Sequence, residues 1–222
     1  MIRLLSAIAT LFLISACSNS PELETGEIRT LSLIRQAINE PKNPRFSVDV
    51  KKIITRRKID AAKIPVLFVE LESGQNGTLT PYPGRGIGQT WLGADGATIT
   101  FEQGVLKASR GMGDDVMGGN SSKPPWHKIE GSADYFRFLS YLDGNNKVYT
   151  VEFKCKIQIS KDIQYLEILN VYFKTVLFQE TCSSKNNEIK NLYYIDESWI
   201  VRKSIQFHGK TLGYITTERL ER

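Results

Sequence analysis

The sequence contains few of the residues that most often carry catalytic or metal chemistry. Among its 222 residues are two histidines, His127 and His208, and three cysteines, Cys17, Cys155 and Cys182. The histidines are distant from each other, no obvious nucleophile accompanies either one, and the cysteine spacing is not that of a metal site. These absences argue against a catalytic cluster, and we expect no metal and no cofactor.

Long apolar runs are also missing after residue 14. The one such run, residues 4–14, follows Arg3 and, as a helix, would reach only about half of the ~30 Å hydrocarbon core of a bilayer. A basic start followed by a short apolar stretch is typical of a secretory signal peptide rather than a membrane-spanning helix. We therefore predict export, with residues 1–16 removed.

The end of this run predicts how the signal is processed. Ile14-Ser15-Ala16-Cys17 resembles a lipobox, in which a branched residue and two small residues precede a cysteine that accepts a diacylglycerol group. We predict that lipid on Cys17 anchors the protein to a membrane and that residues 17–26 form a tether. In the alternative, cleavage near Ala16 leaves a free thiol, which is a hazard in an oxidising compartment. In enteric-type bacteria, a residue such as Ser18 in place of Asp resembles the signal for sorting to the outer membrane.

Excess positive charge is confined to a short segment. The formal net charge is +5, and residues 41–63 contain eight basic residues against two acidic ones. Nucleic acid is not an expected partner of an exported chain, whereas an anionic glycan or lipid head group suits such a segment. A solvated helix face is the alternative interpretation.

Strand patterns dominate the sequence after residue 65. Residues 149–159 alternate between apolar and polar side chains, which places Cys155 on the buried face of a strand. We predict an all-β fold, a single antiparallel β-barrel or β-sandwich domain over residues 27–222, with minor N-terminal helices at 27–39 and 50–62. The other expected strands are residues 66–71, 89–92, 97–101, 105–109, 165–180, 189–195, 199–207 and 212–217.

The two cysteines of the predicted domain suggest a crosslink. An even number of cysteines in an exported protein favours a disulfide, here Cys155 to Cys182 across neighbouring strands. A disulfide there would stabilise the fold by roughly 3–4 kcal/mol, because it restricts the conformations of the unfolded chain. Two free buried thiols are the alternative.

Residues 110–119 form a glycine-rich segment directly after an expected strand. We predict a rigid loop that reaches the surface and contributes to partner or glycan recognition without chemistry, with substitutions at Arg110 or Asp115 leaving stability nearly unchanged. A purely structural turn is the competing interpretation. Adjacent carboxylates seldom flank a sugar as glycoside hydrolysis requires. The candidate recognition residues are Arg110, Gly111, Gly113, Asp114 and Asp115.

The three tryptophans are candidates for stacking against sugar rings. Trp91, Trp126 and Trp199 each offer a large aromatic face, although packing in the core or at an interface is the commoner use of this side chain.

Two segments resemble a known family. Residues 90–117 read TWLGADGATITFEQGVLKASRGMGDDVM, and residues 191–213 read NLYYIDESWIVRKSIQFHGKTLG. With the lipobox and the cysteine pair, they resemble the YjbF/GfcB lipoproteins of group 4 capsule and exopolysaccharide production, with Met112 and Val116 standing where leucine is expected. The resemblance implies a periplasm-facing outer-membrane lipoprotein that acts beside an outer-membrane β-barrel and a second periplasmic protein in polysaccharide export. It implies no catalytic residue.

Three functions from different classes follow. The sequence favours a non-enzymatic factor for assembly or secretion of an exopolysaccharide, which should co-purify with an outer-membrane barrel. A glycan-binding lipoprotein, which should retain polysaccharide directly, is second. A carbohydrate-active enzyme is third, and its turnover should be abolished by Asp114→Asn or Asp115→Asn.

Overall fold

The computed structural model describes residues 49–83, 88–143, 145–185 and 187–222. The predicted signal peptide, the lipidation of Cys17, the tether and the helix at 27–39 lie outside the described residues.

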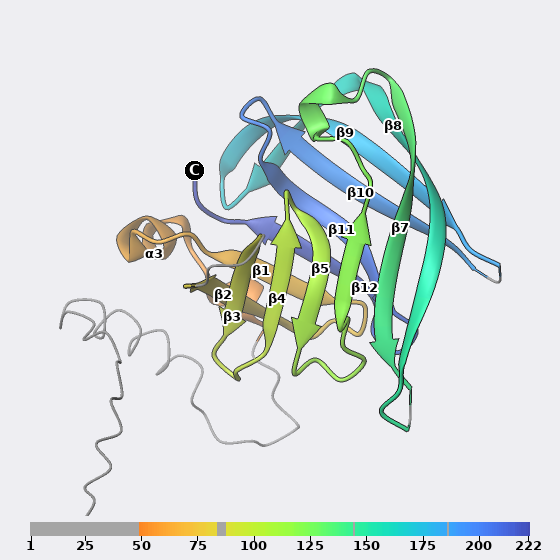
Figure 1. The fold of residues 1–222 in the computed structure, drawn as a ribbon. Helices are drawn as coiled ribbons and strands as arrows, with labels where there is room; N and C mark the ends of the chain where they lie inside the picture. The colour runs from red at the N-terminus through yellow and green to blue at the C-terminus, as the bar shows by residue number, and fades with distance from the viewer. Residues whose placement is uncertain (1–48, 84–87, 144, 186) are drawn as a thin grey trace, which may run out of the picture. The chain divides into compact units, whose positions relative to one another are not determined.

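Antiparallel strands build most of the described chain. They form one 12-stranded sheet in the order β5-β4-β3-β2-β1-β12-β11-β10-β9-β8-β7-β6, so nearly every strand pairs with its neighbour in the sequence (Figure 1). The strands are β1 (Leu67–Leu71), β2 (Asn76–Tyr82), β3 (Gln89–Gly93), β4 (Thr98–Glu102), β5 (Val105–Arg110), β6 (Gly118–Ser121), β7 (Ser132–Leu142), β8 (Val148–Ile168), β9 (Val171–Ser183), β10 (Glu188–Asp196), β11 (Val201–Gly209) and β12 (Gly213–Arg219).

The two edges of this sheet meet, so the sheet is a nearly closed barrel. In Figure 1, β6 lies between β5 and β7 at the front of the molecule. The backbone N–H of Ser109 donates to the carbonyl of Val116 at 2.9 Å. A Cβ atom at Gly119 would lie only 3.1 Å from the carbonyl oxygen of Lys107, so a glycine allows the close approach of β6 to β5. The predicted all-β fold is confirmed, and of the two predicted closures the structure adopts the barrel.

The barrel interior is filled by alternate residues of the strands. Because successive side chains of a strand point to opposite faces, residues such as Phe153, Cys155 and Ile157 of β8 are buried, whereas Lys154 and Lys156 between them are exposed. The short helix η1 (Trp126–Lys128) places Trp126 over the interior.

Two short helices precede the barrel. The predicted helix at 50–62 is divided into α2 (Val50–Ile53) and α3 (Arg56–Ala62), with the Thr55 side chain capping α3. Arg56 donates to the carbonyls of Ile168, at 2.8 Å, and Leu220, which ties α3 to the β8–β9 turn and to the C-terminal segment. A second apolar cluster lies there, formed by Ile59, Val66, Phe68, Ile168 and Leu220. None of the helices in the described ranges is long and apolar enough to cross a bilayer.

The prediction of one continuous strand at 165–180 is wrong, because the chain turns near its start. β8 ends at Ile168 and β9 begins at Val171, so Leu169 and Asn170 form a two-residue hairpin turn. Both residues have positive φ, at 48° and 63°. Such turns usually contain glycine, and the absence of glycine here hid the turn in the sequence. The sequence interpretation also missed β2, β6 and β7.

Candidate functional site

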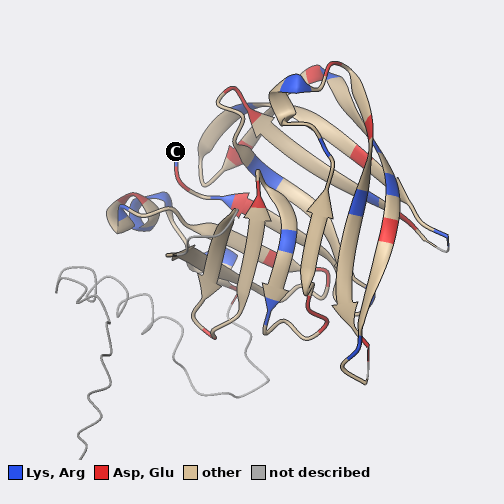
Figure 2. Ribbon diagram, viewed as in Figure 1, with Lys and Arg blue, Asp and Glu red and all other residues tan. Residues whose placement is uncertain are grey.

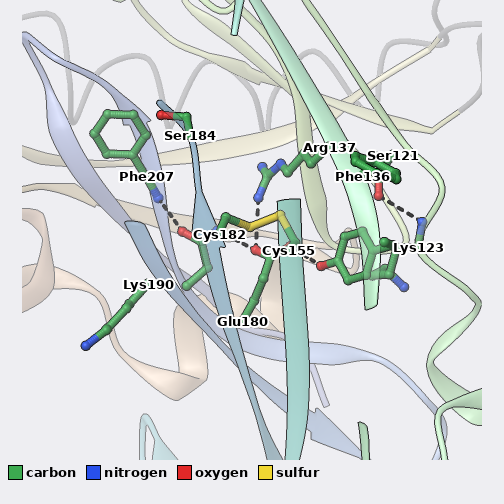
Figure 3. The surroundings of a disulfide bond; sticks show 12 residues. Ser121, Lys123, Phe136, Arg137, Cys155, Glu180, Cys182, Ser184, Lys190 and Phe207 are labelled. Atoms are coloured by element: carbon green, nitrogen blue, oxygen red, sulfur yellow. Dashed lines mark hydrogen bonds and ion pairs between the residues drawn. A yellow bond between two sulfur atoms is a disulfide. The ribbon is translucent and has the colours of Figure 1, made fainter. Parts of the chain in front are cut away.

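A fully buried carboxylate lies inside the barrel. Glu180 of β9 forms a salt bridge with Arg137 of β7 at 3.0 Å, and the two side chains are 0% and 1% exposed (Figure 3). Tyr135, Asn191 and Tyr193 also donate to this carboxylate. Burial raises the pKa of Tyr193 well above its usual value and that of Tyr135 as well, with the Glu180 charge adding to both shifts, so both phenols remain protonated donors. This network braces the barrel rather than offering a reactive group.

A second set of hydrogen bonds joins opposite parts of the sheet. Gln206 of β11 accepts from the Leu106 backbone N–H at 2.9 Å and donates to the Gly104 carbonyl at 2.8 Å and the Ser204 hydroxyl at 2.9 Å. The polar side chains of these two sets are therefore hydrogen-bonded to one another and to the backbone.

Ser109 and His208 form a buried pair that the sequence did not reveal. The Ser109 Oγ donates to Asp115 Oδ1 at 3.0 Å and lies 2.9 Å from His208 Nε2. Since the one hydroxyl proton goes to Asp115, we assign the proton between Ser109 and His208 to Nε2 of the histidine. A serine nucleophile needs the opposite arrangement, with the hydroxyl donating to the histidine. Burial lowers the pKa of His208, and its Nδ1 has no partner in the described part of the chain.

The charged side chains of the loop at 110–119 form hydrogen bonds with backbone groups of the loop and of the residue before it. The Arg110 guanidinium donates to the carbonyls of Ser109, Val116 and Met117. Asp115 accepts from the backbone N–H groups of Gly111 at 2.8 Å and Met112 at 3.1 Å. Gly111 and Gly113 have positive φ, at 78° and 106°, as the bend requires.

The remaining acidic residue of this loop is also engaged. Asp114 accepts from the backbone N–H of Thr211 in the β11–β12 turn at 3.2 Å. The hydrogen bonds of Arg110 and Asp115 brace the loop, and a role of these residues in recognition stays a prediction.

The tryptophans differ in exposure. Trp91 and Trp126 are 4% and 3% exposed, so the prediction that they stack on sugars is wrong. Trp126 packs against Phe178 and Tyr193 and carries the Lys123 ammonium 3.7 Å above its ring. Burial also lowers the pKa of Lys123 to about 8.

Trp199 is the exposed tryptophan, and its ring can still contact a ligand. It is 50% exposed and lies in the β10–β11 turn with a φ of 62°, not in the strand predicted at 199–207. Its ring packs edge-on against the ring of His127, with 6.0 Å between the two ring centroids.

Further exposed aromatic residues lie on a hairpin that a salt bridge joins to the turn holding Trp199. Tyr165 and Tyr172, on the β8–β9 hairpin, are 71% and 67% exposed. Tyr165 lies opposite Lys174 of β9, and Lys174 forms a salt bridge at 2.6 Å with Glu197 in the turn that holds Trp199. We call Tyr165, Tyr172 and Trp199 the aromatic rim. The sequence interpretation missed the two tyrosines because it placed them on one continuous strand.

The basic segment is partly neutralised by its neighbours. Lys52 pairs with Asp49 at 3.3 Å, and Arg56 lies 3.8 Å from Asp60. Figure 2 shows basic and acidic residues beside each other on α3. Residues 41–48 of this segment lie outside the described ranges.

Cys155 and Cys182 are joined by a disulfide in the structure (Figure 3). They are directly opposite each other in the register of β8 and β9, with Cα atoms 4.0 Å apart. These two sulfur atoms and the Glu180 carboxylate are the one cluster of potential metal ligands among the described residues. With both sulfurs bonded to each other, the cluster would offer a metal only a carboxylate that already accepts hydrogen bonds.

Comparison with known proteins found a matching family and a similar solved structure. The sequence model of a family described as "Group 4 capsule polysaccharide lipoprotein gfcB, YjbF" matches residues 40–220. The crystal structure of the hypothetical lipoprotein YmcC from Escherichia coli (K12) is similar with a TM-score of 0.67 and 17% sequence identity, covering 76% of this chain and 89% of that one. At this identity the similarity shows the fold alone. No curated protein matches the sequence.

Proposed function

Because the chain belongs to the family of group 4 capsule polysaccharide lipoproteins, we propose that it is a non-enzymatic accessory factor in the assembly or secretion of a capsule or exopolysaccharide. The family match confirms the resemblance found in residues 90–117 and 191–213. The observation that carries the proposal is the contrast between a barrel interior of mutually bonded side chains and an exposed aromatic rim. Exposed tyrosine and tryptophan side chains are typical of binding surfaces.

The proposed location is the periplasmic face of the outer membrane. Lipid on Cys17 is the anchor, residues 1–16 are the removed signal peptide, residues 17–26 are the tether, and residues 27–222 are the barrel domain. The proposed partners are an outer-membrane β-barrel protein and periplasmic polysaccharide-export proteins. The lipobox and the serine that follows Cys17 support this arrangement.

Direct glycan binding is the second candidate. The aromatic rim favours it, because flat aromatic faces beside the charged pair Lys174–Glu197 suit sugar rings with their hydroxyl groups. A carbohydrate-active enzyme is disfavoured, since both aspartates already accept hydrogen bonds from backbone N–H groups, Asp115 within its own loop and Asp114 from the β11–β12 turn.

The aromatic rim provides the test of the accessory role. Cells that carry Tyr165→Ala, Tyr172→Ala and Trp199→Ala together should display much less surface polysaccharide than wild type, at equal abundance of membrane-bound protein. The matched control is Tyr82→Ala, which removes another half-exposed aromatic side chain, on β2. Wild-type amounts of surface polysaccharide in the triple variant would show that the rim has no part in export.

A further inference from the structure

A groove runs over the outer face of the barrel on β7, β8 and β9. Its volume is about 550 Å³, within the range of roughly 300–1,000 Å³ that is usual for ligand sites. Its lining combines apolar surface with polar and charged side chains and includes Asp134, Phe136, Lys154, Lys156, Gln158 and Thr181.

The strand register explains how these side chains come together. Tyr135 and Cys155 are buried in the barrel, so the residues on either side of each point outward. Phe136 lies opposite Lys154, and Asp134 lies opposite Lys156. On the other side of β8, Lys154 lies opposite Ser183 and Lys156 opposite Thr181. The groove therefore presents two adjacent rows of side chains across three strands.

The floor of the groove is held firmly from within. The disulfide joins β8 to β9 at Cys155, the residue between the two lysines, and the Arg137–Glu180 salt bridge joins β7 to β9 beside Phe136 (Figure 3). A site on crosslinked strands loses little conformational entropy when a ligand binds, which favours affinity.

The chemistry of the lining suits a carbohydrate with negative charge. Phe136 is 44% exposed, and a sugar can place its C–H face against such a ring. Neither Lys154 nor Lys156 forms an ion pair with any residue that the structure describes. Asp134, Gln158 and Thr181 can exchange hydrogen bonds with hydroxyl groups. With two lysines and one aspartate among the lining residues, the groove has a net charge of +1.

We propose that this groove binds an acidic polysaccharide, one whose sugars carry carboxylates, with Lys154 and Lys156 on the carboxylates and Phe136 beneath a sugar ring. The choice of a polysaccharide rests on the proposed function. An anionic bilayer could also meet the lysines, but a flat membrane surface leaves the hollow of the groove unfilled, whereas a sugar chain can lie within it.

The test uses the full lipoprotein in nanodiscs of zwitterionic lipid, with oligogalacturonate as the acidic probe and maltooligosaccharide of equal length as the neutral one. The wild-type protein should bind oligogalacturonate more tightly than the neutral probe, with an affinity that falls as salt is added. Lys154→Gln combined with Lys156→Gln should weaken the binding at least tenfold, and so should Phe136→Ala.

Two control variants match these changes. Lys147→Gln with Lys210→Gln removes the same charge from exposed turns elsewhere, and Tyr82→Ala removes an exposed aromatic side chain. Both should keep wild-type affinity. The proposal is overturned if the wild type does not bind oligogalacturonate, or if the control lysine pair weakens binding as much as the groove pair. It is also overturned if the groove variants bind oligogalacturonate as the wild type does and lose binding only to vesicles of anionic lipid.

These results are separable from the accessory role. A groove that binds no oligogalacturonate, in a protein whose rim variants still reduce surface polysaccharide, would refute the groove alone. Binding in the groove without any export defect in cells that lack the protein would refute the accessory role alone.

Discussion

Arg110 shows at the level of a single residue how a surface charge can be structural. Its guanidinium bonds three backbone carbonyls across the start and end of the loop at 110–119. Replacement by alanine should therefore lower the free energy of unfolding by about 1–3 kcal/mol, because these carbonyls lose their charged donor. Urea unfolding measures this loss, with Lys210→Ala, at an exposed lysine, as the control. Equal stability of the Arg110→Ala variant and the wild type would instead leave this side chain free for recognition.

His208 predicts a dependence of stability on pH. Burial lowers the pKa of this histidine in the folded protein, opposed by the charges of Asp115 and Asp114. A proton added at Nδ1 would find no partner in the described structure. The unfolded chain takes up that proton below about pH 6.5, whereas the folded chain does not, so stability should fall as the pH decreases from about 6.5 toward the lower folded pKa.

The measurement is the free energy of unfolding between about pH 5 and 8. His208→Gln removes the titrating group and should flatten this part of the curve relative to wild type. A variant that keeps the full wild-type slope would assign the effect to other groups.

The β8–β9 pair carries the clearest prediction for an element. Its two strands are crosslinked at Cys155 and Cys182. The exported protein, denatured without reductant, should offer neither of these thiols to an alkylating reagent. Replacing both cysteines by alanine should lower the free energy of unfolding by about 2–5 kcal/mol. Two alkylatable thiols in the unreduced protein would show that the strands are not crosslinked in the cell.

Strands were predictable where one face is buried and the other is exposed to solvent. The alternation in residues 149–159 predicted the first half of β8, including the buried position of Cys155. The second half was not predictable in the same way. After an irregularity between Ile159 and Ile163, the strand extends to a turn of Leu169 and Asn170, and exposed residues such as Tyr165 alternate with residues that pack against α3. Periodicity within one segment does not reveal such a second packing partner.

The candidate sites depend on contacts between distant residues, which the amino-acid composition does not reveal. The exposed Trp199 and the buried Trp91 and Trp126 are the same residue type, and only their places in the barrel distinguish them. The network around Glu180 gathers side chains from β7, β9 and β10. Sequence patterns placed Glu180, Asn191 and Tyr193 on strands but missed β7, which holds Tyr135 and Arg137, and they did not show that these residues lie beside one another.

At the scale of the whole molecule, the sequence did not determine whether the sheet closes as a barrel or folds as a sandwich. A barrel and a sandwich require the same alternation along each strand. The difference lies in how the edges meet, and here β5 approaches β6 while Gln206 of β11 reaches the backbone of β5 inside the barrel. Such contacts between residues about 100 positions apart leave no local signature.

The accessory role is tested most directly by the polysaccharide that cells display. The measurement compares the amount and the repeat-unit structure of surface polysaccharide in cells that lack this protein and in cells that carry wild type or Cys17→Ser. Loss of the protein should lower the amount while the sugars and linkages stay unchanged, and Cys17→Ser, which cannot be lipidated, should not restore it. An unchanged amount of surface polysaccharide, or a polymer with altered linkages, would contradict a lipid-anchored, non-enzymatic factor in export.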